Sequence, residues 1–423
     1  MKVLWLLNSL PPAAREHFDV KGNNKEGWIE GVLTRIQESD KPDFELTIVF
    51  PVKSEDQVCE FRKAGIDYVS FLEDTDRPEY YDPYVEFQLR EIVEKQAPQV
   101  IHIFGTEYPH CFAMALGCKE YRDKMLIGIQ GVVSECAKHY CDGLPDKIIN
   151  RKTFRDRVKK DGIKEQQEKF LKRASFEEAA LKLVKHVTGR TEFDREFVKS
   201  VNPEVHYHYM SESMRACFYE GSWDQESCEK NALFLSQGNY PIKGAHYILE
   251  ALPEIAKEIP DVKLYIAGDN ITKNKTLFEK IKLSGYGKYL RILLKRGKLQ
   301  DRVFFLGSLN AEAFKAQMLK SNAQVLVSTI ENSPNSIGEA ELLGLPTVTT
   351  DAGGITSIFD DGRDGIVYKA GSKEALIKAV IKMLKDTEMQ KAYSENAKAH
   401  GKKLYDRDEN YKTLLKIYEE IAG

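Results

Sequence analysis

The sequence predicts an α/β protein made of two doubly wound domains, each with a parallel sheet covered by helices. A chain of 423 residues suits two large domains. Short aliphatic and β-branched runs recur along it, and several end at a glycine or in a polar loop, as buried parallel strands do. Residues 324–350 show the complete pattern, because a strand, a helix and a second strand follow one another there.

The composition excludes several classes of protein. A formal net charge of −3, with 30% charged residues, predicts a soluble protein without a global bias toward nucleic acid, so no nucleic-acid partner is expected. The first apolar run, residues 3–7, is too short for a signal peptide, and no run approaches the roughly 18 apolar residues of a membrane span. The seven cysteines are odd in number and scattered, which predicts reduced thiols in a cytoplasmic protein.

The predicted N-terminal domain covers residues 1–205. Its expected strands are the apolar runs at 2–7, 45–50, 67–71, 100–104, 125–129 and 184–188. A helical pattern at 85–95 leads into the strand at 100–104. Residues 206–228 follow without clear periodicity, and we expect them to link the two domains.

The predicted C-terminal domain covers residues 229–400. Its expected strands lie at 232–236, 262–268, 303–307, 324–328 and 347–350. Helical patterns follow at 373–384 and 389–403, and a last helix is expected at 411–421, within a C-terminal segment of residues 401–423.

Clear start and stop signals mark the helix inside residues 324–350. Ser333 is a good N-cap, and Pro334 then stands at the first helical position, where its missing N–H does no harm. Gly344 is expected to end the helix, with Pro346 two residues further on.

Two carboxylates flank the start of this helix. Glu331 lies in the loop after the first strand, and Glu339 lies more than a turn into the helix with its side chain tilted back toward the helix start, so both can face one crevice. Between them, the backbone N–H groups of Asn335, Ser336 and Ile337 point at that crevice together with the positive end of the helix dipole, which suits a diphosphate. Because a carboxylate accepts two hydrogen bonds from neighbouring hydroxyls, the predicted ligand is a sugar nucleotide.

These residues resemble a known family. The spacing E-x7-E, followed by Ala340, Gly344 and Pro346 and then by Gly353 and Gly354, is similar to the signature of the family 4 retaining glycosyltransferases, which have the GT-B fold. The resemblance implies two Rossmann-like domains that face across a cleft, the second binding the donor and the first presenting the acceptor surface. It also implies that Glu331 contacts the donor sugar, that Glu339 holds the nucleotide ribose and that the last helix crosses back to the first domain.

Other donor-binding residues follow from the same resemblance. Family members place an Arg and then a Lys on the donor diphosphate after the first strand of the second domain. Asn239 stands at the Arg position here, while Lys243 keeps the Lys. Arg190 could replace the missing Arg, or it could pair with Glu192 or Asp194.

Two glycine loops also resemble loops of the family. The loop that contains Gly27 resembles the first loop of GT-B enzymes, which approaches the donor phosphate, although a plain turn is an equal alternative. Gly354 lies in a loop that resembles the one over the donor, but Ser357 stands where a Glu is usual.

The acceptor-side candidates lie in the first domain. Glu107 and His110 belong to a polar loop after the strand at 100–104, at the edge where doubly wound sheets bind ligands. Gln130 follows the strand at 125–129, near the place where much of the family has a His. A lone His is more often structural, and both readings of His110 stay open at this point.

Residues 147–173 carry 11 basic and 4 acidic residues with apolar residues interspersed, in a partly amphipathic helical pattern. This stretch is either a solvated face or a surface for anionic lipid headgroups. The second alternative would place a cytoplasmic protein peripherally at the inner face of the plasma membrane. Lipid-linked glycans or surface polysaccharides, which the resemblance favours, would then be the acceptors.

The predicted reaction is glycosyl transfer from a nucleotide diphosphate sugar to a hydroxyl. Lys243 and the amides of Asn335 and Ser336 would stabilise the departing diphosphate, so no metal and no cofactor are expected. Retention of configuration is implied by the resemblance alone. The Asp-x-Asp at residues 74–76 lies away from the donor residues and is interpreted as a solvated turn.

Three alternatives remain open from the sequence. A sugar-nucleotide epimerase of the same fold would bind the donor without an acceptor. A non-catalytic partner is suggested by Asn239, Gln130 and Ser357, which depart from the family pattern. A dinucleotide dehydrogenase would need G-x-G-x-x-G after a strand, and the sequence contains none.

Overall fold

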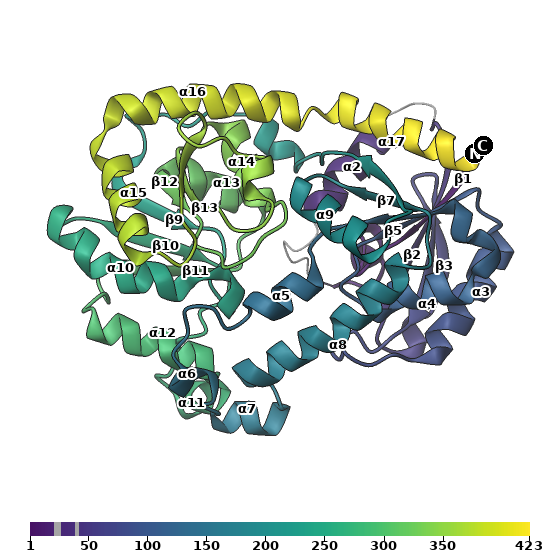
Figure 1. The fold of residues 1–423 in the computed structure, drawn as a ribbon, viewed down its shortest axis with the longest axis horizontal. Helices are drawn as coiled ribbons and strands as arrows, with labels where there is room; N and C mark the ends of the chain where they lie inside the picture. The colour runs from purple at the N-terminus through teal and green to yellow at the C-terminus, as the bar shows by residue number, and fades with distance from the viewer. Residues whose placement is uncertain (21–26, 39–41) are drawn as a thin grey trace. The chain divides into compact units, whose positions relative to one another are not determined.

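The computed structural model describes residues 1–20, 27–38 and 42–423 (Figure 1). These residues form two compact units. Unit 1 contains Met1–Ala137, Lys169–Met214 and Tyr405–Gly423, and unit 2 contains Lys138–Glu168 and Arg215–Leu404. Among the described residues, no helix is both long enough and apolar enough to cross a membrane.

The predicted N-terminal domain, residues 1–205, was wrong at one place, because residues 138–168 belong to unit 2. Within unit 2, α6 (Asp146–Ile149) contacts α12 (Gly285–Arg296), and α7 (Phe154–Lys159) contacts α11 (Leu277–Lys282). The buried carboxylate of Asp156 strengthens this attachment, since its Oδ2 accepts a hydrogen bond of 2.8 Å from the amide of Gly285. The chain therefore enters unit 2 inside α5 (Val133–His139) and returns to unit 1 inside α8 (Ile163–Leu181).

Unit 1 is built on an eight-stranded sheet in the order β3-β4-β2-β1-β5-β6-β7-β8. All neighbouring strands are parallel except β3 and β4. The strands are β1 (Lys2–Leu6), β2 (Glu45–Val52), β3 (Glu60–Lys63), β4 (Ile66–Leu72), β5 (Val100–Phe104), β6 (Met125–Gly128), β7 (His186–Gly189) and β8 (His206–Tyr209). The helices are α1 (Pro12–His17), α2 (Gly27–Gln37), α3 (Pro83–Gln96), α4 (Pro109–Gly117), α5 (Val133–His139), α9 (Glu192–Val201), α17 (Arg407–Ala422) and the second half of α8.

Two strands of unit 1 were not predicted. β3 is short and exposed at the antiparallel edge, and β8 lies inside the expected linker 206–228. The sequence of β8 is His-Tyr-His-Tyr, and as an edge strand it lacks the aliphatic run that marks the inner strands.

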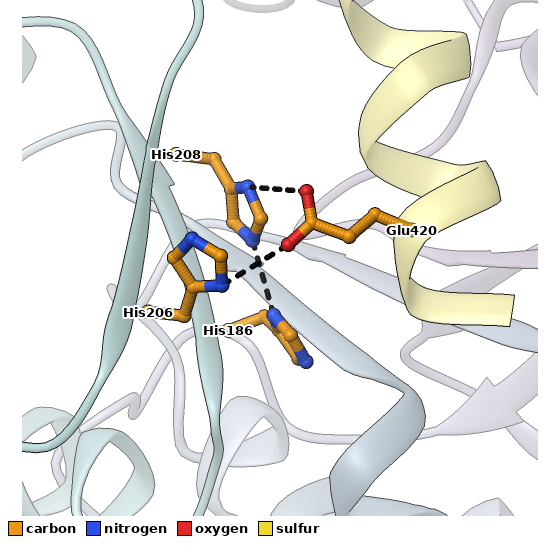
Figure 2. A group of neighbouring side chains, drawn as sticks. All are labelled: His186, His206, His208 and Glu420. Carbon is orange, nitrogen blue, oxygen red and sulfur yellow. Dashed lines mark hydrogen bonds and ion pairs between the residues drawn. The ribbon is translucent and has the colours of Figure 1, made fainter. Parts of the chain in front are cut away.

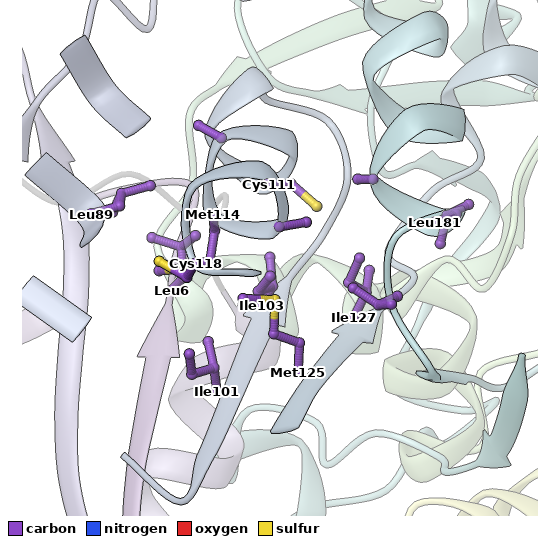
Figure 3. Packing of buried hydrophobic residues seen from close by; sticks show 14 of the residues in the cluster. Leu6, Leu89, Ile101, Ile103, Cys111, Met114, Cys118, Met125, Ile127 and Leu181 are labelled. Atoms are coloured by element: carbon purple, nitrogen blue, oxygen red, sulfur yellow. The ribbon is translucent and has the colours of Figure 1, made fainter. Parts of the chain in front are cut away.

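Apolar side chains cover both faces of the unit 1 sheet. On one face, Cys111 and Met114 of α4 pack over Ile101 and Ile103 of β5 and Ile127 of β6 (Figure 3). On the other face, side chains of α2 and α17 pack over those of β1, β2 and β5.

A buried hydrogen-bond pair fixes α17 on this second face. The hydroxyl of Tyr418 accepts from Trp5 Nε1 at 2.8 Å and lies 2.7 Å from His102 Nδ1. Burial lowers the pKa of His102 to about 3, so the imidazole is neutral.

Unit 2 is built on a six-stranded parallel sheet in the order β11-β10-β9-β12-β13-β14. The strands are β9 (Glu229–Leu235), β10 (Lys263–Ala267), β11 (Val303–Gly307), β12 (Ser321–Val325), β13 (Thr347–Thr350) and β14 (Gly365–Tyr368). The helices, besides α6, α7, α11, α12 and the first half of α8, are α10 (Ala245–Glu258), α13 (Ala311–Lys320), α14 (Asn335–Leu343), α15 (Lys373–Lys385) and α16 (Thr387–Leu404). The strand predicted at 324–328 begins three residues earlier, because the whole of Ser321–Val325 is buried, polar residues included.

In both sheets the strand order reverses at one point. In unit 1 the reversal lies between β1 and β5, and in unit 2 it lies between β9 and β12. In doubly wound sheets, ligands bind in the crevice that such a reversal leaves at the carboxyl ends of the strands. The residues that follow these four strands are therefore the first candidates for a functional site.

One buried cluster in unit 2 makes the stability of the protein depend on pH. His400 of α16 places Nδ1 3.1 Å from Glu341 Oε1 of α14 and 2.9 Å from Asp364 Oδ2. Hydrogen bonds to Asp364 and Glu341 raise the pKa of His400 to about 9, and burial raises the pKa of Glu341 to about 7. The His400 contribution to stability is complete below its ordinary pKa of about 6.5 and is lost as the pH rises through 9.

We therefore predict that the thermal unfolding midpoint of the protein falls between pH 7 and pH 9, and that His400→Gln reduces this slope. Glu341 also titrates in the lower part of this range and changes the stability in the same direction, so the part of the slope that His400→Gln removes reports His400. His17→Gln, at an exposed histidine, is the matched control and should keep the wild-type slope. Equal slopes for wild type and His400→Gln would contradict the prediction.

Candidate functional site

The carboxyl edge of β9, β12 and β13 brings together the two residues predicted to act in catalysis. Lys243 ends the short helix η5 (Pro241–Lys243) after β9, and Glu331 lies in the loop after β12. Lys243 Nζ donates to Glu331 Oε1 at 2.5 Å, and Ser328 Oγ donates to the same oxygen at 2.8 Å. The side chains of Lys243 and Glu331 are 20% and 12% exposed, so this ion pair is largely shielded from water. The sequence predicted both residues for the site but not their direct pairing.

Glycines allow the loops around this ion pair to touch. Gly244 has a φ of 68°, and a Cβ there would lie 1.7 Å from the carbonyl oxygen of Val327. Gly353 has a φ of 59°, and a Cβ there would lie 2.0 Å from the carbonyl oxygen of Glu331. No other residue fits at either contact without moving the loop.

Gly354 was predicted to bind the donor directly. Its N–H instead donates to the carbonyl oxygen of Glu331 at 3.0 Å. Gly354 therefore holds the loop that carries Glu331, and its amide is not presented to a ligand.

The start of α14 differs by one residue from the prediction. Asn335 is the first helical residue, Pro334 takes the N-cap position, and Ser333 lies outside the helix. The amide of Ile337 donates to the carbonyl oxygen of Pro334 at 2.9 Å, so the prediction that it binds phosphate was wrong. Asn335 and Ser336 remain as the first two helical residues, whose N–H groups an α-helix does not use itself.

Glu339 is not the open carboxylate that the sequence suggested. It is 3% exposed, and its Oε1 accepts from Arg215 Nε at 2.7 Å. The guanidinium of Arg215 also lies over the ring of Phe218, 4.7 Å from the ring centroid. Glu339 faces inward because α14 is buried along most of its length, and its charge is balanced by Arg215.

The carboxyl edge of β1 and β5 in unit 1 carries a hydrogen-bonded network. Asn8, just after β1, donates from Nδ2 to Glu107 Oε2 at 2.8 Å. His110 Nε2 lies 2.8 Å from Asn8 Oδ1, and His110 Nδ1 lies 2.6 Å from Glu73 Oε2. Because both ring nitrogens of the fully buried His110 have protein partners, the structure favours the structural one of its two readings.

Glu107 remains a candidate on this edge, because its side chain is only partly buried. Burial raises the pKa of Glu107, while Arg173 and the Asn8 amide oppose the shift. A neighbouring carboxyl was not predicted from the sequence. Glu177 of α8 accepts from Thr106 Oγ1 at 2.6 Å and from the amide of Ser134 at 3.0 Å, and burial raises its pKa to about 7.

Gln130 and Arg190 meet in a pocket of unit 1 at the ends of β6 and β7. Arg190 NH1 lies 2.5 Å from Glu212 Oε2, and Arg190 NH2 donates to the carbonyl oxygen of Ile129 at 3.2 Å. With its amide oriented to suit its neighbours, Gln130 donates to Glu212 at 3.0 Å and accepts from Arg190 at 3.2 Å. The Arg190 side chain pairs with neither of the acidic residues suggested by the sequence, and only its backbone amide contacts Asp194, at 3.0 Å.

Gly27 is the first residue of α2, and the loop before it, residues 21–26, lies outside the described residues. The Asp-x-Asp of residues 74–76 forms surface ion pairs, Asp74 with Arg77 at 2.7 Å and Asp76 with Lys53 at 2.5 Å. All seven cysteines are free.

Several residues at the carboxyl edges of the two sheets were not predicted from the sequence. Asn8 directly follows the predicted strand at 2–7, and Glu73 comes two residues after the predicted strand at 67–71, so the rule that singled out Glu107 would also have found them. Arg215 gave no such signal, because it lies in the expected linker and its partner Glu339 is 124 residues away in the sequence.

Part of the chain matches a known family. Residues 221–400 match the family described as "Glycosyl transferases group 1". The chain is 26% identical over 195 residues to phosphatidyl-myo-inositol mannosyltransferase of Mycobacterium leprae, which covers 46% of this chain and 47% of that protein. It is 27% identical over 180 residues to alpha-D-kanosaminyltransferase of Streptomyces kanamyceticus, which covers 43% of each. Each alignment thus spans less than half of the relative's length.

Solved structures resemble the chain over its whole length. Sucrose-phosphate synthase from Thermosynechococcus elongatus matches with a TM-score of 0.70 and 12% identity, over 100% of this chain and 99% of that chain. HepE from Anabaena, in complex with UDP-glucose, matches with a TM-score of 0.68 and 15% identity, over 99% of this chain and 100% of that chain. These matches confirm the predicted GT-B fold.

The buried pair of Arg215 and Glu339 yields a stability prediction. Arg215→Ala should lower the free energy of unfolding by about 3–5 kcal/mol, because it leaves a buried carboxylate without its counter-ion. The double variant Arg215→Met with Glu339→Met should recover most of that loss, because neither charge then remains buried. Urea unfolding measures both effects.

The matched control is Lys385→Ala, which breaks an exposed, solvent-screened pair with Glu258 and should change the free energy of unfolding much less. If Arg215→Ala costs no more than this control, the pair does not have the structural role described.

Proposed function

We propose that this chain, which carries a glycosyl transferases group 1 domain in residues 221–400 and has the GT-B fold, transfers a sugar from a nucleotide diphosphate sugar to a hydroxyl. One observation carries the proposal. A lysine and a glutamate are held within one hydrogen bond of each other at the carboxyl edge of β9 and β12, where the strand order of unit 2 reverses.

Lys243 supplies positive charge for the donor diphosphate. Its ammonium group lies beside Glu331 and is a compact positive charge that can donate to a phosphate oxygen. Negative charge grows on the diphosphate as the bond to the sugar breaks, and a preorganised ammonium stabilises that charge more in the transition state than in the ground state. The first-turn amides of Asn335 and Ser336 add to this stabilisation.

Glu331 orients the sugar. Among the described residues, Lys243 and Ser328 donate to its side chain, and both use Oε1. A sugar hydroxyl would donate to Oε2, and the carboxylate would also face the positive charge that develops at the anomeric carbon. Glu339, paired with Arg215, holds α14 in place beneath the loop.

On this proposal the acceptor hydroxyl is bound at the β1 and β5 edge of unit 1, with Glu107 as the hydrogen-bond acceptor. The charge on the leaving diphosphate is balanced by Lys243 and backbone amides, so the proposal needs no metal and no cofactor. Retention of configuration is part of the proposal through the family resemblance.

The test is release of nucleoside diphosphate from a panel of sugar nucleotides, with and without candidate acceptors. Lys243→Ala should lower turnover by roughly 100-fold or more, the usual size of one lost electrostatic contact in a transition state. Lys295→Ala, at an exposed lysine of α12, is the control and should leave turnover unchanged. Interconversion of the donor sugar without release would support an epimerase, and equal turnover of wild type and Lys243→Ala would contradict the proposed role of Lys243.

We also propose that the protein works peripherally at the inner face of the plasma membrane, with a lipid-linked glycan as an acceptor. The support is a surface of unit 2 where α7 and α11 contact each other. It exposes large apolar side chains, namely Phe154 (66%), Val158 (67%), Leu277 (75%), Phe278 (63%) and Ile281 (44%). The exposed basic residues on and beside these helices are Arg157, Lys159, Lys160, Lys273, Lys275, Lys280 and Lys282.

Apolar side chains surrounded by cations suit an anionic bilayer, because the rings can enter the headgroup region while each basic residue contributes about 1 kcal/mol. One relative of this chain, the phosphatidyl-myo-inositol mannosyltransferase of Mycobacterium leprae, is named for a phospholipid, which also supports a lipid-linked acceptor.

Sedimentation with vesicles tests the membrane surface. The full chain should bind phosphatidylglycerol vesicles and bind phosphatidylcholine vesicles much less, and Phe278→Ser should weaken binding roughly tenfold or more. Phe87→Ser, at an exposed residue of α3 in unit 1, should bind as the wild type does. Binding that does not depend on lipid charge or on Phe278 would contradict this part of the proposal.

A further inference from the structure

Three histidines gather on one face at the edge of the unit 1 sheet. In the parallel pairing of β7 with β8, His186 is opposite His206, and Thr188 is opposite His208. His206 and His208 are two residues apart in β8, so their side chains point to the same face of the sheet. The rings of His206 and His208 stack with centroids 4.3 Å apart.

Glu420 of α17 points toward these histidines from the helix beside the sheet (Figure 2). Its Oε1 lies 3.1 Å from His206 Nδ1. On the other side of the cluster, His186 Nδ1 lies 3.0 Å from His208 Nε2. One ligand atom from each of the four residues lies within 4.8 Å of the other three.

These distances are close to those of a metal site. In tetrahedral zinc sites the ligand atoms lie about 2.0–2.1 Å from the ion, which places them roughly 3.3–3.4 Å from one another. The two closest pairs of ligand atoms in the cluster, at 3.0 and 3.1 Å, are slightly closer than the spacing in a zinc site. The other pairs lie within 4.8 Å of one another, and side-chain rotation can bring them to that spacing.

The ligand chemistry favours zinc over harder cations. Imidazole nitrogens suit zinc, while magnesium and calcium prefer sites made of oxygen atoms. The side chains of His206 and Glu420 are 56% and 50% exposed, which leaves a path for an ion from solvent.

The described part of the chain contains a second group of metal-ligating residues, but that group is not rich in imidazole ligands. It consists of Glu341, Asp364 and His400, in which the two carboxylates already bind His400 at 3.1 and 2.9 Å. The carboxylates hold a proton on that imidazole, and a metal would have to displace it. In the cluster of β7, β8 and α17, three imidazoles share a single carboxylate.

We propose that His186, His206, His208 and Glu420 bind one zinc ion, which ties the C-terminal helix α17 to the edge strand β8. The site has a structural role rather than a catalytic one. His186 and His206 open their strands, whereas the candidate acceptor residues of unit 1 follow the carboxyl ends of theirs. Glu420 lies in the last turn of α17, so the ion would hold that turn against the sheet.

The test begins with the full chain after treatment with a chelator. Calorimetric titration with zinc chloride should show one tight site per chain, and His206→Ala and Glu420→Gln should each weaken that site at least tenfold. Both residues are half-exposed, so these variants should fold, which circular dichroism checks. His17→Ala, at an exposed histidine on α1, should bind zinc as the wild type does.

A cobalt titration excludes the seven cysteines as the ligands. Cobalt at the proposed site should give the visible bands of a tetrahedral nitrogen and oxygen site, without the near-ultraviolet band of thiolate ligands. Zinc should also slow hydrogen exchange in α17 and β8 of the wild type but not of His206→Ala. Absence of one-to-one binding, a thiolate band, or unchanged binding by both variants would overturn the proposal.

Discussion

The arrangement at the carboxyl edge of unit 2 depends on two places where backbone meets backbone. Gly244 lies against the carbonyl of Val327, and Gly353 lies against the carbonyl of Glu331, so closely that a single methyl group would not fit. These contacts fix the loops after β9, β12 and β13 relative to one another. Lys243 and Glu331 each stand beside one of these contacts, and they meet at 2.5 Å. A charged pair held by rigid backbone needs little reorganisation when charge develops on a ligand, which is the condition for strong electrostatic catalysis.

Elements whose signals are local were predictable. The runs at 100–104 and 303–307 coincide with β5 and β11, and Gly344 ends α14 with a φ of 73°. β8 was missed because an edge strand of alternating His and Tyr has no aliphatic run. The placement of residues 138–168 in unit 2 was missed because it rests on contacts with helices more than a hundred residues further along the chain.

The same limit applies to the candidate site. A position just after a strand predicted that Glu331 and Glu107 lie at the edges where ligands bind, and the family resemblance singled out Lys243. Neither signal could predict what else reaches those edges. His110 was left with a structural and a functional reading, and only the structure shows that Asn8 and Glu73, which follow other strands, contact both of its ring nitrogens. Pairing between distant residues leaves no pattern in a sequence. Burial, by contrast, gives a hydrophobic periodicity, and turns are marked by particular residues such as glycine.

The most direct test of the proposed donor site is calorimetric binding of a nucleoside diphosphate and of its sugar derivative to wild type, Lys243→Met and Glu331→Gln. Lys243→Met should weaken the binding of both ligands, because the diphosphate is common to them. Glu331→Gln should weaken the binding of the sugar nucleotide only, because Glu331 contacts the sugar. Binding of both ligands with wild-type affinity by both variants would contradict the account.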